Sequence, residues 1–252
     1  MKITVLGSAS GMPISQRNSS AYLVEVKSRL YLVDAGEGVA QQLVRYQIDP
    51  SEIYQVFITH VHADHAVGLF MLLQWMHLCK RKDPLAIYLP KGVLQGLNAV
   101  LSFFHIFQEK WSFQFDFHPI SERFVFNQSG FQLSAIPNYH LQGNEYLAAK
   151  SGWGSDSYSF LLTEENKGKV IYTSDVDSLV HLEANKKGVD ILISECAHIS
   201  VEDILDFACS AGIPRVILTH IPPEMEHFSL SEIRKLESMT VELVSDGQVI
   251  EV

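Results

Sequence analysis

Three histidines and one aspartate stand within six residues of one another in the segment Thr59-His60-Val61-His62-Ala63-Asp64-His65. Neutral imidazole and carboxylate are the nitrogen and oxygen ligands that zinc and related divalent ions use in proteins. A polar, solvated turn would explain one histidine, but not four ligating side chains in His-x-His-x-Asp-His spacing. The segment therefore predicts a metal site.

The elements on either side indicate how these side chains are positioned. Residues 54–59 form an apolar run that predicts a buried strand, and residues 66–80 predict a helix. The ligands then lie on the turn between them, where a rigid scaffold presents loop side chains to one point. Strands alternate with helices along the whole chain, which predicts an α/β fold. Helices are expected at 37–46, 66–80, 91–107, 177–185, 200–211 and 229–238.

Four side chains cannot complete a site for two ions, so further ligands are expected elsewhere. His140 and His220 each follow an apolar strand and precede a loop, which is the position that a ligand needs. Asp175 follows the apolar run 170–173 in the same way. The alternatives are structural, because such residues also cap strands and helices, and Asp175 would serve as the N-cap of the helix expected at 177–185.

Five segments resemble, in this order, the signature motifs of the metallo-β-lactamase superfamily, and in particular of its ribonuclease Z branch and related phosphodiesterases. They are Leu6-Gly7-Ser8-Ala9-Ser10-Gly11-Met12-Pro13 with Arg17-Asn18, Asp34-Ala35-Gly36-Glu37-Gly38, Thr59 to His65 with Gly68-Leu69, Tyr172-Thr173-Ser174-Asp175, and Leu218-Thr219-His220. The resemblance covers nearly the whole chain. It implies one domain over residues 1–252, built as an αββα sandwich of two mixed β-sheets flanked by helices.

The resemblance also implies a ligand set for two divalent ions. The first ion would be held by His60, His62 and His140, the second by Asp64, His65 and His220, and Asp175 would bridge both. Zinc suits ligands that are mainly imidazole, with manganese and iron as alternatives. Such a pair of ions activates water for hydrolytic attack, which makes Asp64 part of the catalytic centre as well as a ligand. Asp34 and Glu195 are candidates to accept hydrogen bonds from ligating histidines, or else are ordinary turn residues.

His198 stands before the helix expected at 200–211, where the resembled enzymes have a histidine followed by a glutamate. His198 and Glu202 are the matching residues here. The histidine would donate a proton to a leaving oxygen, and the carboxylate would orient it and raise its pKa. The structural alternative is a hydrogen-bonding role at the start of the helix.

Composition agrees with a globular enzyme that acts on a small substrate. The 252 residues are 47% hydrophobic and 19% charged, which is ordinary for an α/β protein and excludes disorder. The net charge is −10 and no basic run exceeds Lys80-Arg81-Lys82, whereas proteins that bind long nucleic acids present a basic face. Cys79, Cys196 and Cys209 form no disulfide or metal pattern, and no stretch resembles a membrane span or a signal peptide. A cytoplasmic protein is expected.

The chain departs from ribonuclease Z between the strands expected at 157–163 and 169–173. Ribonuclease Z inserts a basic, glycine-rich arm for tRNA at this place, and here a short turn leaves no room for it. We therefore expect a phosphodiesterase acting on small or cyclic phosphodiesters. The alternatives are a ribonuclease Z-like endonuclease for tRNA 3′ processing, a lactonase, thioesterase or β-lactamase on the same scaffold, and a metal-binding protein without catalysis.

Aromatic residues indicate two further features. Trp153 lies on a loop after His140, where its ring would either stack on a base or an apolar group, or anchor the loop. The segment 101–107 is rich in phenylalanine. Core packing, an apolar substrate wall and the interface of a homodimer are its three alternatives.

Overall fold

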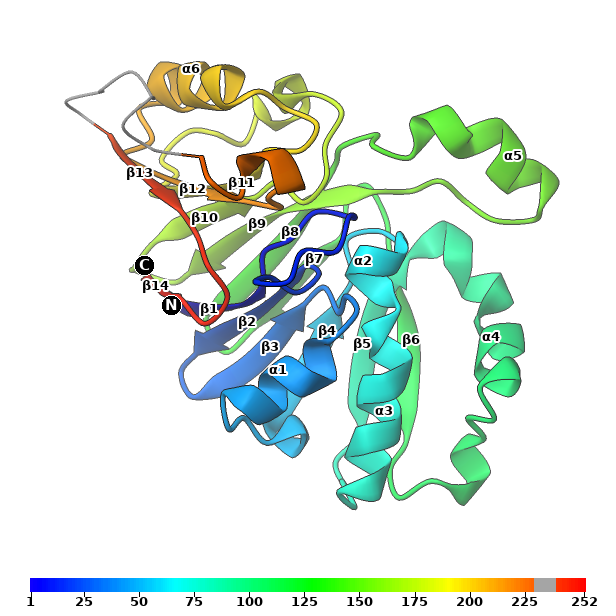
Figure 1. Cartoon of the computed structure of the whole chain (residues 1–252). Coiled ribbons are helices and arrows are strands. Elements are labelled where there is room, and N and C mark those ends of the chain that lie inside the picture. Colours follow the sequence, from blue (N-terminus) through cyan, green and yellow to red (C-terminus); the bar gives the residue numbers. More distant parts are fainter. Residues whose placement is uncertain (229–238) are drawn as a thin grey trace.

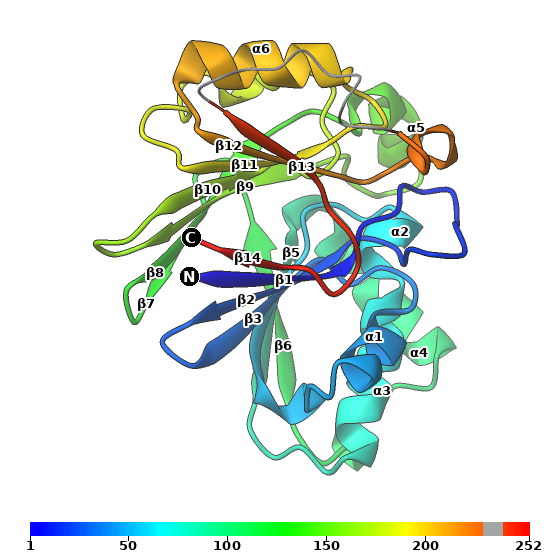
Figure 2. The ribbon, with the colours of Figure 1, turned by 60° about the vertical axis from the view of Figure 1, so that its left-hand side comes forward.

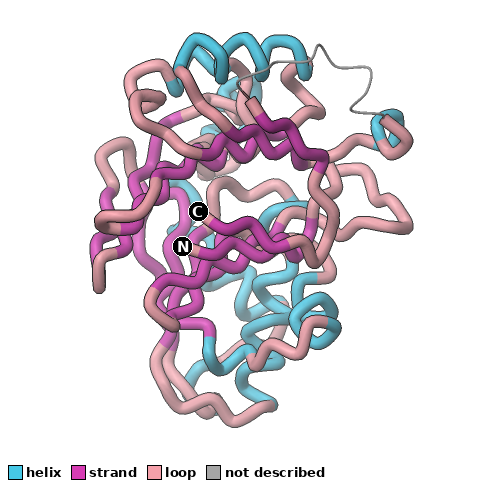
Figure 3. The backbone as a smooth tube through the Cα atoms, turned by 90° about the vertical axis from the view of Figure 1, so that its left-hand side faces the viewer, coloured by secondary structure: helices cyan, strands magenta, loops and turns pink. Residues whose placement is uncertain are grey.

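The two sheets expected from the sequence are present. The computed structural model describes residues 1–228 and 239–252, and the strands in these ranges form two sheets of seven. The sheets pack face to face and helices cover their outer faces (Figure 1). Figure 3 shows the strands in magenta at the centre and the helices in cyan outside them. The predicted αββα sandwich is confirmed, and the helix expected at 229–238 lies outside the described residues.

The first sheet is mixed. Its strands are β1 (Lys2–Gly7), β2 (Ala21–Val26), β3 (Arg29–Val33), β4 (Ile53–Phe57), β5 (Leu85–Pro90), β6 (Phe115–Ile120) and β14 (Val249–Glu251). They follow the order β14-β1-β2-β3-β4-β5-β6. Neighbours from β3 to β6 are parallel, whereas β1 and β2 pair with their neighbours antiparallel.

The second sheet is mixed in the same way. Its strands are β7 (Val125–Gln128), β8 (Phe131–Pro137), β9 (Tyr158–Glu164), β10 (Lys169–Tyr172), β11 (Ile191–Glu195), β12 (Arg215–Thr219) and β13 (Thr240–Leu243). They follow the order β13-β12-β11-β10-β9-β8-β7. β10 to β13 are parallel and β9 runs against both β8 and β10. β8, β10 and β12 therefore end at the same edge of the sheet.

Short helices cover the sheets, and within the described residues none is long and apolar enough to cross a membrane. The α-helices are α1 (Val39–Arg45), α2 (Ala63–Ala66), α3 (Gly68–Leu78), α4 (Leu97–Phe103), α5 (Glu145–Lys150) and α6 (Val201–Ala211). The 3-10 helices are η1 (Pro50–Glu52), η2 (Lys91–Gly96), η3 (Gln108–Lys110), η4 (Gln142–Asn144), η5 (Leu179–Leu182) and η6 (Pro223–Met225).

Two expected helices are shorter than the sequence predicted. The segment 91–107 forms η2 and then α4, because Gly92 and Gly96 favour helix poorly and the Trp153 ring packs where a side chain at Gly96 would lie. The segment 177–185 forms only η5, a single turn that Ser178 caps. The helix expected at 66–80 instead begins inside the histidine motif, at Ala63 in α2.

Three apolar layers hold the sandwich together. In the layer between the sheets, Tyr31 of β3 and Phe131 of β8 come from opposite sheets, and their ring centroids lie 4.6 Å apart. Leu72 of α3 is buried on the outer face of the first sheet, and Ile204 of α6 on that of the second. Burial of each such side chain stabilises the fold by about 1.5–3 kcal/mol, so the layers form a stiff support for the loops at the sheet edge.

Candidate metal centre

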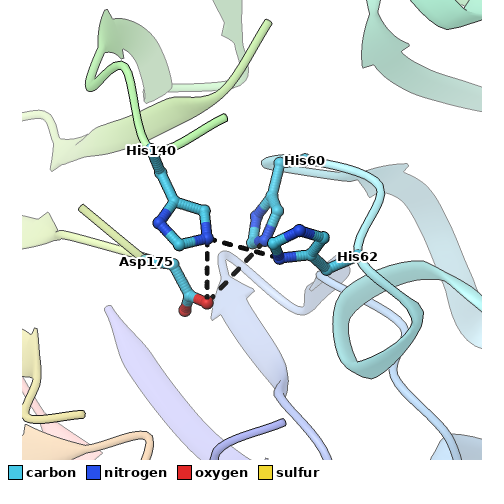
Figure 4. Close-up of side chains that lie close together, drawn as sticks. All are labelled: His60, His62, His140 and Asp175. Atoms are coloured by element: carbon cyan, nitrogen blue, oxygen red, sulfur yellow. Dashed lines mark hydrogen bonds and ion pairs between the residues drawn. The ribbon is translucent and has the colours of Figure 1, made fainter. Parts of the chain in front are cut away.

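Seven side chains from the segments that follow β4, β8, β10 and β12 meet at one edge of the sandwich, and two of them, Asp64 and His65, lie in α2. The sequence named all seven, and the structure brings them together in two groups that share Asp175. The first cluster is His60, His62, His140 and Asp175, and the second cluster is Asp64, His65, Asp175 and His220. In each cluster the candidate ligand atoms lie within 4.8 Å of one another. Figure 4 shows the imidazoles of the first cluster around the Asp175 carboxylate.

The two oxygens of Asp175 face different clusters. Its Oδ2 lies 3.8 Å from His60 Nε2 and 3.6 Å from His140 Nε2. Its Oδ1 lies 3.1 Å from His65 Nε2 and 3.3 Å from His220 Nε2. This is the arrangement that a carboxylate needs in order to bridge two cations.

The buried polar atoms at the centre of this site fit a pair of cations. His60 Nε2, His65 Nε2 and Asp175 Oδ1 are buried, and none has a hydrogen-bond partner in the described part of the chain. Buried polar atoms are normally satisfied, because leaving one unpaired costs free energy. Imidazole nitrogens and a carboxylate oxygen turned toward one point would be satisfied by a divalent ion, and the donor set suits zinc, manganese or iron.

Strained backbone lies at and beside several residues of the site. Asp34, Ser174 and His220 have φ of 59°, 51° and 53°, and Tyr139, next to His140, has φ of 59°. Residues other than glycine adopt this left-handed conformation at a cost of roughly 1–3 kcal/mol. All four residues lie in loops at the edge where the clusters form, so the fold tolerates strain here and uses it to turn the chain sharply.

Side chains around the clusters fix the histidine rings. Asp34 accepts hydrogen bonds from His65 Nδ1 at 2.8 Å, from the Thr59 backbone N–H at 2.8 Å and from the Tyr172 hydroxyl at 2.9 Å. Ser20 Oγ lies 3.1 Å from His220 Nδ1. Such contacts orient ligating rings and leave Nε2 turned toward the ion. Asp34 was an expected candidate for this role, whereas Ser20 carries no signal in the sequence.

Burial and neighbouring charges divide the protonation states within the site. Burial lowers the pKa of His60, His140 and His220 below the ordinary histidine value, which favours the neutral, ligating form. Burial alone would raise the pKa of Asp175, but the surrounding imidazoles hold it well below its ordinary value. Burial also disfavours imidazolium at His65, yet the carboxylates of Asp175 and Asp34 outweigh it and raise the pKa of His65 well above its ordinary value.

The carboxylate beside His198 is Glu195, not the expected Glu202. His198 Nδ1 lies 3.3 Å from Glu195 Oε1, and Glu195 Oε2 accepts hydrogen bonds from the backbone N–H groups of Ala197 and His198. Glu202 is exposed in the first turn of α6, where an acidic side chain stabilises the helix N-terminus. His198 itself borders the clusters, since its ring centroid lies 4.9 Å from that of His140 and 6.1 Å from that of His220.

Trp153 and the phenylalanine-rich segment 101–107 have different surroundings. Trp153 anchors its loop, because its ring packs against Gly96 and the backbone N–H of the following Gly154 donates to Gly92 O at 2.8 Å. In the segment 101–107, Leu101 and Ile106 are buried in the core. The phenylalanines of the segment are exposed, at 77% for Phe103, 45% for Phe104 and 40% for Phe107. Core packing therefore accounts for only part of this segment.

A comparison with families of known proteins decides where the chain belongs. Residues 1–239 match the model of the family described as Anti-Pycsar protein Apyc1. The chain belongs to the Apyc1 family. Curated relatives include the ribonuclease Z of Thermococcus sibiricus, which is 29% identical over 81% of this chain and 76% of the relative. The ribonuclease Z of Methanothermobacter thermautotrophicus is 24% identical over 88% of this chain and 86% of the relative.

Solved structures share the fold of this Apyc1-family chain. The short form of human tRNase Z superposes with a TM-score of 0.75 at 23% identity, covering 100% of this chain and 99% of the other. The metallo-β-lactamase fold protein YhfI from Bacillus subtilis superposes with a TM-score of 0.77 at 20% identity, covering 99% and 98%. The resemblance to the metallo-β-lactamase superfamily and its ribonuclease Z-like branch is confirmed. The chain is a metal-dependent hydrolase of this fold.

Proposed function

We propose that this chain is a two-metal phosphodiesterase that acts on small or cyclic phosphodiesters. The observation that carries the proposal is Asp175, whose two oxygens face separate clusters of imidazoles. In the proposed assignment, His60, His62 and His140 bind one ion, and Asp64, His65 and His220 bind the other. Zinc is the preferred metal, because most of these ligands are imidazoles.

The residues of the chain then divide the work of hydrolysis. When bound, the two ions supply a nucleophile from water at neutral pH and neutralise charge on the phosphate. Asp175 and the six other ligands hold the phosphate-binding charges in place, while Asp34 keeps His65 in the ligating orientation. His198 donates a proton to the leaving oxygen, and Glu195 orients its ring and favours its protonated form by raising its pKa.

Three observations support a small substrate. Only residues 165–168 join β9 to β10, where ribonuclease Z would carry its tRNA arm. The net charge is −10. A groove of about 680 Å³ is lined by His198 and by carboxylates that include Asp177, Glu183 and Asp203. Carboxylates on the leaving-group side repel a further phosphate, so a polynucleotide would bind there poorly.

Ribonuclease Z-like processing of tRNA 3′ ends is the second candidate. Curated relatives with the name ribonuclease Z are similar to this chain over most of its length. Lactone or thioester hydrolysis stays the third, since the same scaffold supports it. The substrate class is tested by hydrolysis of bis(p-nitrophenyl) phosphate, a cyclic mononucleotide, a precursor tRNA, p-nitrophenyl acetate, a lactone and nitrocefin. Asp64→Ala is the control in every assay.

The proposal predicts turnover of the two small diesters that Asp64→Ala abolishes, and little cleavage of precursor tRNA. Efficient precursor tRNA cleavage would move the assignment to the second candidate. Cleavage of the ester or lactone without diester turnover would be compatible with the metal centre but would contradict phosphodiesters as the substrate class.

We also propose that the chain forms a homodimer through the exposed phenylalanines Phe103, Phe104 and Phe107. Large aromatic side chains are enriched in such interfaces. Light scattering across micromolar concentrations should give twice the mass of the chain, and Phe103→Ser should lower it to that of a monomer. A monomer mass for the unaltered protein at every concentration would exclude the dimer.

A further inference from the structure

A carboxylate remote from the metal motifs organises a loop that borders the second cluster. Asp246 lies in the segment that crosses from β13 in one sheet to β14 in the other, and Figure 2 shows this red segment beside the dark blue chain after β1. Asp246 Oδ1 accepts from Ser8 Oγ at 2.7 Å. Asp246 Oδ2 accepts from the Asn18 backbone N–H at 2.7 Å, from Asn18 Nδ2 at 3.0 Å and from Gln42 Nε2 at 2.9 Å.

These bonds close a loop that we call the N-terminal loop, residues 8–20. Ser8 opens this loop and Asn18 lies near its end, so one carboxylate ties its two stems together. Arg17 Nη1 reinforces the closure by donating to Ser8 Oγ at 2.7 Å and to the Val244 carbonyl. The bonds to Asp246 have a charged acceptor and those from Arg17 a charged donor, and both kinds are stronger than bonds between neutral groups.

The N-terminal loop contacts the His220 ring and the backbone of the residue that follows it. Ser20 Oγ lies 3.1 Å from His220 Nδ1. The residue after the histidine, Ile221, donates its N–H to Ser8 O at 2.8 Å and accepts from the Ser10 N–H at 3.1 Å. Because His220 has a strained φ of 53°, its ring position depends on such constraints on the neighbouring backbone.

The same loop also borders Asp64. A Cβ built on Gly11 would lie only 3.4 Å from Asp64 Oδ2, so the loop backbone passes directly beside this carboxylate. Among the described residues, by contrast, no hydrogen bond joins the N-terminal loop to His60, His62 or His140. The loop therefore touches the second cluster and leaves the first cluster alone.

We propose that Asp246 is a positioning residue for the second metal ion. By closing the N-terminal loop, it fixes the backbone of His220 and the loop backbone at Gly11 that passes beside Asp64. It thereby sets the affinity of one ion of the pair. The inference rests on the proposed two-ion centre. Loss of the Asp246 carboxylate should therefore affect the second cluster and spare the first.

The test is a calorimetric Zn²⁺ isotherm of the metal-stripped full chain. The unaltered protein should bind two ions. Asp246→Asn keeps the size of the side chain, removes its charge and turns an amide toward donors, so the second ion should bind about 10–100-fold more weakly while the first is unchanged. Asp190→Asn is the matched control, because Asp190 also accepts a backbone N–H, from Lys169 at 2.8 Å, but in a distant turn. This control should bind both ions normally.

Two further variants identify the affected site and guard against misfolding. Adding His62→Ala to Asp246→Asn should remove the tight binding that remains, since that binding belongs to the first cluster. Ser8→Ala removes the hydrogen bonds of the Ser8 hydroxyl but keeps those from Asn18 to Asp246, and it should weaken the binding of the second ion less. Equal weakening of both ions, or an unchanged isotherm in Asp246→Asn, would overturn the role of Asp246. A single ion in the unaltered protein would instead overturn the two-ion centre itself.

Discussion

His65 is held between two carboxylates that act on opposite ends of its ring. Its Nδ1 lies 2.8 Å from Asp34 Oδ2, and its Nε2 lies 3.1 Å from Asp175 Oδ1. The Nδ1–H donates to Asp34, which leaves Nε2 as the atom that faces the proposed second ion. Because both carboxylates favour imidazolium, the pKa of His65 is raised well above its ordinary value. An ion that binds Nε2 must therefore displace a proton.

This arrangement predicts proton-coupled metal binding. Below the raised pKa of His65 the ion competes with a proton, so affinity for the second ion should rise with pH until that pKa is passed. Calorimetry below that pKa, in buffers of different ionisation enthalpy, should show that a proton is released when the second ion binds. Asp34→Asn removes one of the two carboxylates, lowers the pKa of His65 and should reduce this release. Binding heat that is independent of the buffer would contradict the assignment.

His198→Ala separates proton donation from metal binding. The variant should keep its metal content, because His198 belongs to neither cluster. Turnover of an unactivated dialkyl or cyclic diester should fall by about 10²–10⁴-fold, the usual contribution of general acid catalysis. Bis(p-nitrophenyl) phosphate needs no protonated leaving group and should be cleaved almost as fast as before. Full activity toward the unactivated diester would remove His198 from the mechanism.

Glu195→Gln tests the electrostatic coupling to His198. The hydrogen bond and charge of Glu195 raise the pKa of His198 above its ordinary value, against the opposing effect of burial. Because His198 acts in its protonated form, kcat should decline as the pH rises through this pKa. Removing the charge lowers the pKa of His198, so the decline should move to lower pH. Glu202→Gln, at an exposed position on α6, should leave the pH profile unchanged. A shift of the profile in Glu202→Gln but not in Glu195→Gln would instead support the pairing of His198 with Glu202.

Arg81 should matter for stability and not for catalysis. Its buried guanidinium donates to the carbonyl oxygens of Ser51 and Ile53 at 2.9 Å each and of Asp83 at 2.8 Å. Arg81→Ala leaves these carbonyls without donors and should lower the free energy of unfolding by about 3 kcal/mol in urea titrations. The exposed Arg45→Ala is the control and should change little. A loss below about 0.5 kcal/mol for Arg81→Ala would contradict this role.

Local sequence patterns predicted the parts of the molecule that depend on local order. The ligands after β4 share one turn, and His140, Asp175 and His220 each follow an apolar strand, so their place at a sheet edge could be read from the chain. Contacts between remote segments could not. Ser8 and Asp246 are 238 residues apart in sequence, and no short pattern indicates that they meet.

What the sequence missed has the same origin. Arg81 belongs to the basic run Lys80-Arg81-Lys82 after α3 and carried no prediction of its own, yet its side chain is only 4% exposed, because the turns before β4 and β5 close around it. Glu202 follows His198 at the spacing of the resembled enzymes, but the chain between them enters α6 and turns Glu202 to solvent. Glu195, at the end of β11, faces the histidine instead.

Anomalous diffraction from crystals grown with Zn²⁺ tests the two-ion centre most directly. A two-ion centre should give two anomalous peaks per chain, about 3.5–4 Å apart, with one oxygen of Asp175 at each peak and His140 and His220 on opposite sides. A single peak, or two peaks of which Asp175 contacts at most one, would contradict it.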